Sequence, residues 1–105
     1  MHELKVSVLI ANYNNQNYLK DCIRSVKKQT YKNIEIIFHD DYSQDRSVYN
    51  ASKFEDIKIL KNKNRGKYGS FNQMKAYQRA FDKSKGEIIF LLDSDDLFSK
   101  KKYKL

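Results

Sequence analysis

Residues 87–96 read EIIFLLDSDD, an apolar run followed by three carboxylates within four positions. The apolar run is typical of a strand that is covered on both faces, as the central strands of parallel sheets are. Residues 5–11, KVSVLIA, have the same character near the start of the chain. We therefore expect two buried parallel strands, of which the later one ends in an acidic turn.

Between these two strands the hydrophobic pattern alternates between helical and extended periods. Further strands are predicted over residues 34–39 and 57–61. Helices are predicted over residues 18–28, over a short segment from Ser43 or Asp45 to about Phe54, and over residues 68–83, and a loop over residues 62–67. Polar residues 15–17 are candidates to cap the first helix. The third helix is expected to carry its apolar stripe at Phe71, Met74, Tyr77 and Phe81.

Four strands alternating with three helices predict right-handed βαβ units and a parallel sheet. The expected fold class is therefore α/β, a Rossmann-like three-layer α/β/α arrangement whose mainly parallel, four-stranded sheet has the order 3-2-1-4. A chain of 105 residues is long enough for one domain. Ligands of such sheets bind beyond the carboxyl ends of the strands, where the strand order reverses. We expect residues 12–14, 40–43 and 93–96 to line one crevice there.

The composition excludes several classes of protein. Hydrophobic residues make up 40 % of the chain, which argues against disorder, and the single cysteine, Cys22, excludes an internal disulfide and a cysteine-rich zinc site. No apolar run is long enough to cross a bilayer, and His2 and Glu3 precede the first strand without a signal peptide, so we expect a cytoplasmic protein.

The formal net charge is +8, and half of this excess comes from four lysines in residues 98–105. A lysine-rich end of this kind is typical of a solvated tail. The alternatives are that it contacts nucleic acid or an anionic membrane surface. Because the tail contains no arginine, no nucleic-acid partner is expected, whereas peripheral membrane contact stays open.

The acidic turn, residues 93–96, carries the strongest chemical signal. Asp93, Asp95 and Asp96 repel one another unless a cation or hydrogen bonds offset the repulsion. Mg²⁺ and Mn²⁺ prefer oxygen ligands, and Mg²⁺ usually takes one or two carboxylates and leaves its other positions to water and substrate phosphates. An acidic turn that caps a following helix explains the same spacing, and both interpretations stay open.

Two further strand ends could contact a ligand. Asp40 and Asp41 could accept hydrogen bonds from a base or ribose, or form an Asx turn. Tyr13 could stack on a nucleobase, or simply pack. Neither glycine-rich phosphate-binding pattern follows the first strand, so phosphates would need a metal instead. His39 and Cys22 are expected to be packed residues and not a catalytic base or nucleophile.

Several of these segments together resemble the opening of family 2 glycosyltransferases. They are VSVLIANYN (6–14), Tyr18-Leu19, IRSV (23–26), QTY (29–31), residues 34–41, NRG (64–66) with Asn72, KGE (85–87) and LDSDD (92–96). The match is collinear from about Lys5 to Leu97. A DxD triplet alone is a weak signal, but these segments in order at consistent spacing are a strong one.

The resemblance implies the nucleotide-sugar-binding half of a GT-A fold. It implies substrate contacts from Ala11, Asn12, Tyr13, Asp41, Asp93 and Asp95, and a divalent Mn²⁺ or Mg²⁺ held by Asp95 and Asp96. In that family the tyrosine packs on the base, the second aspartate after the second strand contacts the base, and the later aspartates hold ribose and metal. Which of these three aspartates ligates the metal directly is left open.

The sequence also departs from the family pattern. Ala11 and Asn12 stand where proline and threonine are usual, and Phe71 stands where an arginine is common. His39 replaces an apolar residue. Tyr42 stands where glycine is common, so we expect a different turn there, because a positive φ is costly for tyrosine.

No catalytic residue can be assigned, because the family's general base lies beyond the metal motif and the chain ends nine residues after Asp96. We therefore expect residues 1–105 to form one truncated donor-binding domain without the acceptor-binding half, inactive on its own. The hypothesis is binding of a nucleotide-diphosphate sugar, UDP by analogy, for inverting transfer to a saccharide or lipid-linked saccharide in cell-surface polysaccharide synthesis. It places the protein in the cytoplasm, at the inner face of the membrane where the acceptor is lipid-linked. The alternative hypothesis is a non-catalytic, homo-oligomeric nucleotide-binding module.

Overall fold

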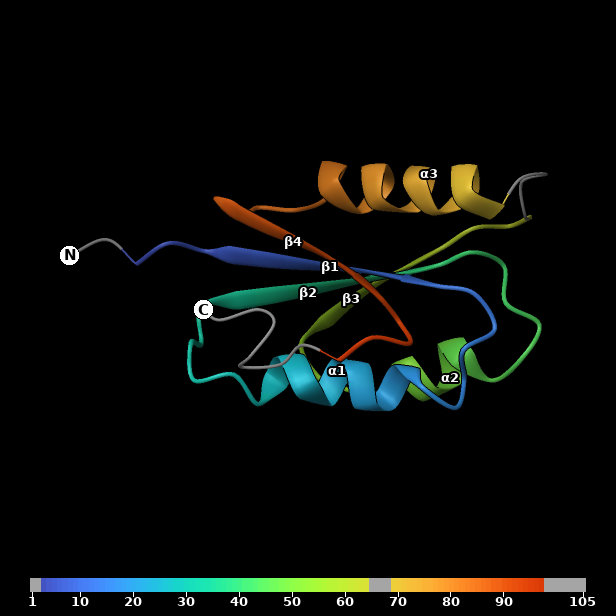
Figure 1. Cartoon of the computed structure of the whole chain (residues 1–105), viewed down its shortest axis with the longest axis horizontal. Helices are drawn as coiled ribbons and strands as arrows, with labels where there is room; N and C mark the ends of the chain where they lie inside the picture. Colours follow the sequence, from blue (N-terminus) through green and yellow to red (C-terminus); the bar gives the residue numbers. More distant parts are fainter. Residues whose placement is uncertain (1–2, 65–68, 98–105) are drawn as a thin grey trace.

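The computed structural model describes residues 3–64 and 69–97, which form three layers (Figure 1). A central sheet is covered by α3 on one face and by α1 and α2 on the other. The elements follow one another as β1 (Val6–Asn12), α1 (Leu19–Lys27), β2 (Ile34–Asp40), α2 (Ser47–Ala51), β3 (Ile57–Lys61), α3 (Gly69–Asp82) and β4 (Ile88–Asp93). This order confirms the predicted alternation of strands and helices.

The sheet has the order β3-β2-β1-β4, and each pair of neighbouring strands is parallel. The predicted α/β class and strand order are therefore confirmed. In the register, Asn12 of β1 lies opposite Asp40 of β2, and Ala11 lies opposite Asp93 of β4. The last residues of β2 and β4 thus flank the end of the strand between them.

Every residue of β1 is buried, as its continuous apolar run predicts. The expectation of a second buried strand is wrong for β4, which lies at the edge of the sheet and exposes Ile88 and Leu91. Val8 and Ile10 belong to the cluster that also contains Ile23 of α1, whereas Leu9 belongs to the cluster that contains Ala80 of α3. Alternate residues of one strand therefore fill two separate cores, as the geometry of a strand between two helical layers requires.

The helix starts agree with the predicted caps only in part. The expected side-chain cap of α1 is wrong: its N-cap is Tyr18, which makes no side-chain capping bond, and the carbonyl of Asn15 accepts from the N–H groups of Tyr18 and Leu19 at 3.0 Å each. For α2, Asp45 Oδ1 accepts from the N–H of Ser47 at 2.9 Å, which fits the predicted capping role of Asp45.

The expected apolar stripe of α3 is wrong in its large side chains. The buried face consists of Asn72, Ala76 and Ala80, with Tyr77 packed beside it, whereas Met74 is 57 % and Phe81 56 % exposed. The side chain of Phe71 lies outside the described residues. Small residues face the sheet because Leu9 and Ile37 already fill the space between the layers.

Among the described helices, none has the length and apolar character needed to cross a bilayer.

Candidate functional site

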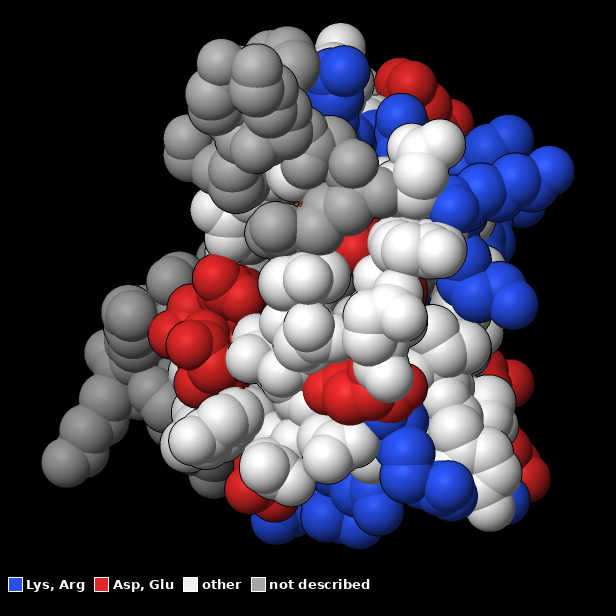
Figure 2. Space-filling model, turned by 90° about the vertical axis from the view of Figure 1, so that its right-hand side faces the viewer, with Lys and Arg blue, Asp and Glu red and all other residues white. Residues whose placement is uncertain are grey.

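The three polar strand ends meet at one edge of the sheet. The N–H of Asp41 donates to the carbonyl of Asn12 at 2.9 Å, and the N–H of Ser94 donates to the carbonyl of Ala11 at 3.0 Å. Two consecutive residues of β1 thus bind the loop after β2 on one side and the acidic turn after β4 on the other. Figure 2 looks at this edge and shows a group of carboxylates on one side and lysine and arginine side chains gathered on the other.

The acidic turn is compact and partly buried. The N–H of Asp96 donates to the carbonyl of Asp93 at 2.9 Å, and Ser94 between them is fully buried. Asp95 is exposed, and Asp93 and Asp96 are half-buried. Burial, and then the neighbouring Asp95 carboxylate, raise the pKa of Asp93 above its usual value. The turn therefore concentrates negative charge that a cation would stabilise.

The donor set of this turn fits a metal that is shared with a substrate. In the part of the chain that the structure describes, no group of three His, Cys, Asp or Glu side chains is placed to hold a metal ion alone. A magnesium-type site needs only one or two carboxylates when phosphates supply further oxygens. Asp95 and Asp96 can provide such a pair, so the residues present fit Mg²⁺ or Mn²⁺ bound together with a diphosphate.

Three side chains from other elements hold the acidic turn in place. Asn15 Nδ2 donates to Ser94 Oγ at 2.8 Å, and Gln73 Nε2 of α3 donates to Asp93 Oδ2 at 2.9 Å. The Cys22 thiol of α1 lies 3.6 Å from the carbonyl of Asp93. Burial raises the pKa of Cys22 to about 12, and the carboxylates of Asp96, Asp93 and Asp95 add to this effect. Cys22 is thus an inert core thiol, as its sequence context indicates.

Both aspartates of the loop after β2 are buried and hydrogen-bonded. Asp40 Oδ2 accepts from the N–H of Ser43 at 2.9 Å, and Asp40 Oδ1 accepts from Asn12 Nδ2 at 2.8 Å. Asp40 therefore forms the turn, as one of the two interpretations of this pair proposes. Asp41 is 6 % exposed, and its Oδ1 accepts from Asn62 Nδ2 at 2.9 Å.

Tyr42 adopts the left-handed conformation, with a φ of 58°. The expectation that the turn would differ here is wrong, because the turn keeps the backbone shape that glycine favours. The left-handed conformation costs a residue with a side chain roughly 1–2 kcal/mol. The bond from the N–H of Ser43 to Asp40 spans Tyr42 and holds the loop in this shape, together with the bond of Asp41 to Asn62.

The remaining candidates are arranged around the end of β1. Ala11 and Asn12 are buried, so they join the two loops through their backbone carbonyls, whereas Tyr13 is 36 % exposed at the edge. The structure thus brings Ala11, Asn12, Tyr13, Asp41 and the acidic turn together.

Sequence reasoning missed Asn15, Asn62 and Gln73, which hold Ser94, Asp41 and Asp93. They are polar residues in polar surroundings, and each bond spans 20 or more positions. No local pattern in the sequence marks them.

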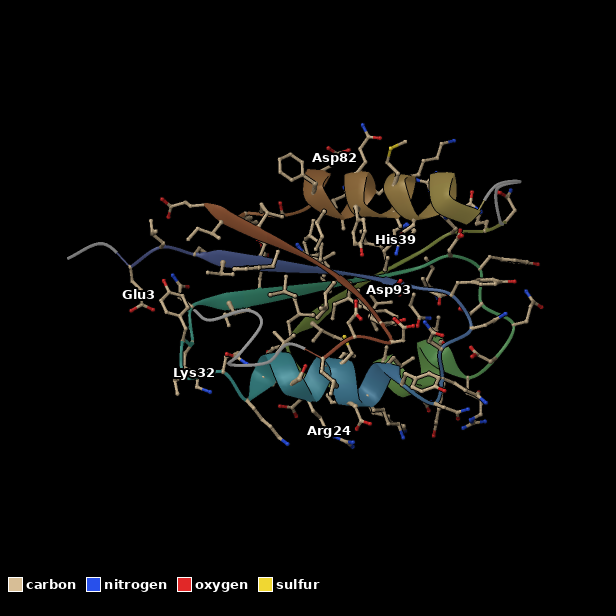
Figure 3. The ribbon with its side chains drawn as sticks, in the orientation of Figure 1. Glu3, Arg24, Lys32, His39, Asp82 and Asp93 are labelled. Carbon is tan, nitrogen blue, oxygen red and sulfur yellow. The ribbon has the colours of Figure 1, made fainter. Side chains whose placement is uncertain are left out.

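His39 is a packed residue, as expected from the sequence. It lies between the sheet and α3 (Figure 3), is 1 % exposed, and its Nδ1 has no hydrogen-bond partner among the described residues. Burial, and then the Arg79 guanidinium, lower its pKa. Its ring is therefore neutral near pH 7.

Solved structures share this arrangement. The structure of residues 1–349 of TarS from S. aureus in complex with UDP-GlcNAc matches 93 % of this chain and 28 % of its own, with a TM-score of 0.81 and 26 % identity. A mannosyltransferase from Pyrobaculum calidifontis, solved with GDP-Man and Mn²⁺, shares the fold with a TM-score of 0.76 at 20 % identity. The fold is therefore that of GT-A glycosyltransferases.

Curated relatives agree with the structural likeness. The chain is 38 % identical to the glycosyltransferase GlyG of Streptococcus pneumoniae over 92 % of its length, and 35 % identical to the β-1,3-glucosyltransferase WfgD of Escherichia coli over 93 %. It spans about a third of these two relatives, 32 % and 38 % of their lengths. The model of "Glycosyl transferase family 2" matches residues 7–105. The chain therefore belongs to glycosyl transferase family 2.

Proposed function

We propose that the edge of the sheet at the carboxyl ends of β1, β2 and β4 binds a nucleotide-diphosphate sugar as the donor for glycosyl transfer. The observation that carries this proposal is the pair of backbone bonds from Asp41 to Asn12 and from Ser94 to Ala11. These bonds tie the loop that carries Asp41 and the acidic turn to consecutive residues of β1, next to Tyr13. The UDP-GlcNAc complex of the TarS fragment supports UDP as the nucleotide class.

Each candidate has a role that follows from its position. The exposed ring of Tyr13 offers a stacking surface for the base, and Asp41 a hydrogen-bond acceptor for it. Asp93 accepts from the ribose, and Asp95 and Asp96 would hold Mn²⁺ or Mg²⁺. Such a metal neutralises the diphosphate and makes it a better leaving group.

Transfer also requires a group that acts on the acceptor. An inverting reaction needs a carboxylate base that takes the proton of the acceptor hydroxyl, and each site residue named above already has a role in binding the donor or the metal. We infer that residues 1–105 bind the donor. The relatives have additional sequence beyond the matched region, and we infer that the acceptor is bound by sequence of that kind. WfgD is named for a diphosphoundecaprenol acceptor, which supports a lipid-linked saccharide acceptor and a place at the inner face of the membrane.

Calorimetric titration of UDP and GDP into the chain, with Mn²⁺ or with EDTA, tests the proposal. We expect binding with Mn²⁺ and at least tenfold weaker binding with EDTA. The double variant Asp95→Ala, Asp96→Ala is expected to lose the dependence on metal. A matched control is Asp21→Asn, Asp82→Asn, which removes two exposed carboxylates outside the site. No heat with the wild-type chain, or equal affinity of the two double variants, would refute the proposal.

A second candidate is an oligomeric nucleotide-binding module without transfer activity. It is favoured by β4, which pairs only with β1 among the described strands and exposes Leu91 to 51 %. Exposed apolar surface of this kind promotes association. Light scattering after size-exclusion chromatography separates the two candidates, because a stable dimer that Leu91→Lys dissociates supports the module.

A further inference from the structure

Gln73 connects the helical layer formed by α3 to the acidic turn. It lies in the second turn of α3, and its Nε2 donates to Oδ2 of Asp93 at 2.9 Å across 20 positions of sequence. The body of α3 packs on β1 and β2, whereas this side chain reaches the end of β4. The contact therefore links α3 to the proposed nucleotide site.

The position of Gln73 suits a role in the site better than a role in folding. Its side chain is exposed, and the residues that hold α3 on the sheet are the buried Asn72, Ala76 and Ala80. An exposed hydrogen bond of this kind adds little to the free energy of folding, because water replaces either partner. Water does not, however, orient the Asp93 carboxylate in one direction as the amide of Gln73 does.

The chemistry of the pair is directional. The amide nitrogen of glutamine is only a donor, and an ionised carboxylate is only an acceptor with about four lone-pair sites. One bond from Gln73 therefore fixes the rotation of the Asp93 carboxylate and leaves capacity for a second donor. Without it, repulsion from Asp95 and Asp96 would turn Asp93 away from the other two carboxylates.

We propose that Gln73 is a positioning residue that directs the Asp93 carboxylate toward the ribose of the bound nucleotide. This inference rests on the proposed function, in which Asp93 contacts the nucleotide and Asp95 and Asp96 hold the metal. It follows that loss of Gln73 weakens nucleotide binding and leaves the affinity for free metal unchanged.

Three variants test this inference in the full 105-residue chain. Gln73→Ala removes the donor, and Gln73→Glu replaces it with an acceptor of the same shape that faces Asp93 with a second negative charge. Gln78→Ala is the matched control, since Gln78 is another exposed glutamine of α3. Calorimetry gives the affinity for UDP at saturating Mn²⁺ and for Mn²⁺ alone, and circular dichroism gives the thermal midpoint.

We expect roughly three- to tenfold weaker UDP binding for Gln73→Ala and a greater loss for Gln73→Glu. Gln78→Ala should bind as the wild type does, and the affinity of Gln73→Ala for Mn²⁺ alone and all thermal midpoints should stay unchanged. Equal UDP affinity of Gln73→Ala and wild type, or equal losses in the alanine and glutamate variants, would overturn the inference alone. A wild-type chain that binds no nucleotide with Mn²⁺ would overturn the proposed function and the inference with it.

Discussion

At the scale of single residues, His39 shows how burial sets a pH dependence. The ring is buried in β2 between Arg79 of α3 and the carboxylates of Asp40 and Asp41. Burial lowers its pKa most, the arginine adds to this effect, and the two carboxylates oppose it. The folded chain therefore binds this proton less readily than the unfolded chain, in which the pKa is about 6.5.

The sign of the effect follows from proton linkage. When the pH falls below about 6.5, His39 takes up its proton in the unfolded chain before it does so in the folded chain. The free energy of unfolding therefore decreases as the pH drops from about 6.5 toward the lower pKa of the folded chain. We expect His39→Val to lose less stability than the wild type between pH 7.5 and pH 5.5 in urea unfolding. His2→Gln keeps the His39 titration and is the control. Parallel pH profiles of wild type and His39→Val would contradict a neutral buried ring.

Gly86 is a second residue whose identity follows from a close approach. Its N–H donates to Ser7 Oγ at 2.8 Å, and an added Cβ would lie 2.6 Å from the backbone nitrogen of Ser7. Real Cβ atoms do not approach backbone so closely, and Ser7 is held in the buried β1. The KGE segment after α3 therefore needs glycine for packing, independently of any ligand.

Replacing this glycine forces β1 and the start of β4 apart. We expect Gly86→Ala to lower the free energy of unfolding by about 1–3 kcal/mol, the usual cost of overpacking. Lys85→Ala is the control, because its side chain is exposed and its backbone N–H is kept. Urea unfolding measures both variants, and equal midpoints for them would show that β4 can shift without cost.

At the scale of elements, α3 shows that residue size decides which face of a helix is buried. Ala76 and Ala80 let the helix approach Leu9 and Ile37 closely, whereas Met74 and Phe81 lie outside. A stripe chosen by hydrophobicity alone selects the wrong residues, because it ignores the volume already filled from the sheet.

Substitutions on the two faces of α3 should therefore affect stability differently from what their change in hydrophobicity alone suggests. We expect Ala80→Leu to cost about 1–3 kcal/mol by overpacking, although it makes the helix more apolar. Phe81→Lys should change stability by less than about 0.5 kcal/mol, as surface substitutions usually do. Guanidinium unfolding of the two variants checks this, and the reverse order of stability would mean that α3 packs on its large residues.

The same comparison shows what the sequence can predict in this fold. The continuous apolar run of β1 identifies a buried parallel strand, whereas the similar run of β4 belongs to an edge strand that is only partly buried. The polar residues after both strands mark the edge where the predicted site residues meet. The cap of α1 and the partners of Asp41 and Asp93 escape prediction, because Asn15 acts through its backbone carbonyl and Asn62 and Gln73 act across space. Such contacts depend on tertiary distances that no local period encodes.

At the scale of the whole molecule, the site exists only when the chain is folded. Its parts come from residues 11–13, 40–41 and 93–96, which are brought together by the parallel pairing of β1 with β2 and β4. A ligand that binds these residues together finds no comparable site in the unfolded chain, where they are far apart. Binding must therefore stabilise the fold as a whole by mass action.

This linkage predicts a metal-dependent rise of the thermal midpoint. A nucleotide diphosphate at a hundred times its dissociation constant adds about 2.7 kcal/mol, and for a chain of this size each kcal/mol raises the midpoint by roughly 4–8 °C. We expect UDP with Mn²⁺ to raise the midpoint by about ten degrees or more. Uridine with Mn²⁺ and UDP with EDTA should each give a smaller rise, because the first lacks the diphosphate and the second lacks the cation that joins it to Asp95 and Asp96. Scanning calorimetry measures these midpoints. Equal shifts with and without metal would mean that the acidic turn takes no part in binding the diphosphate.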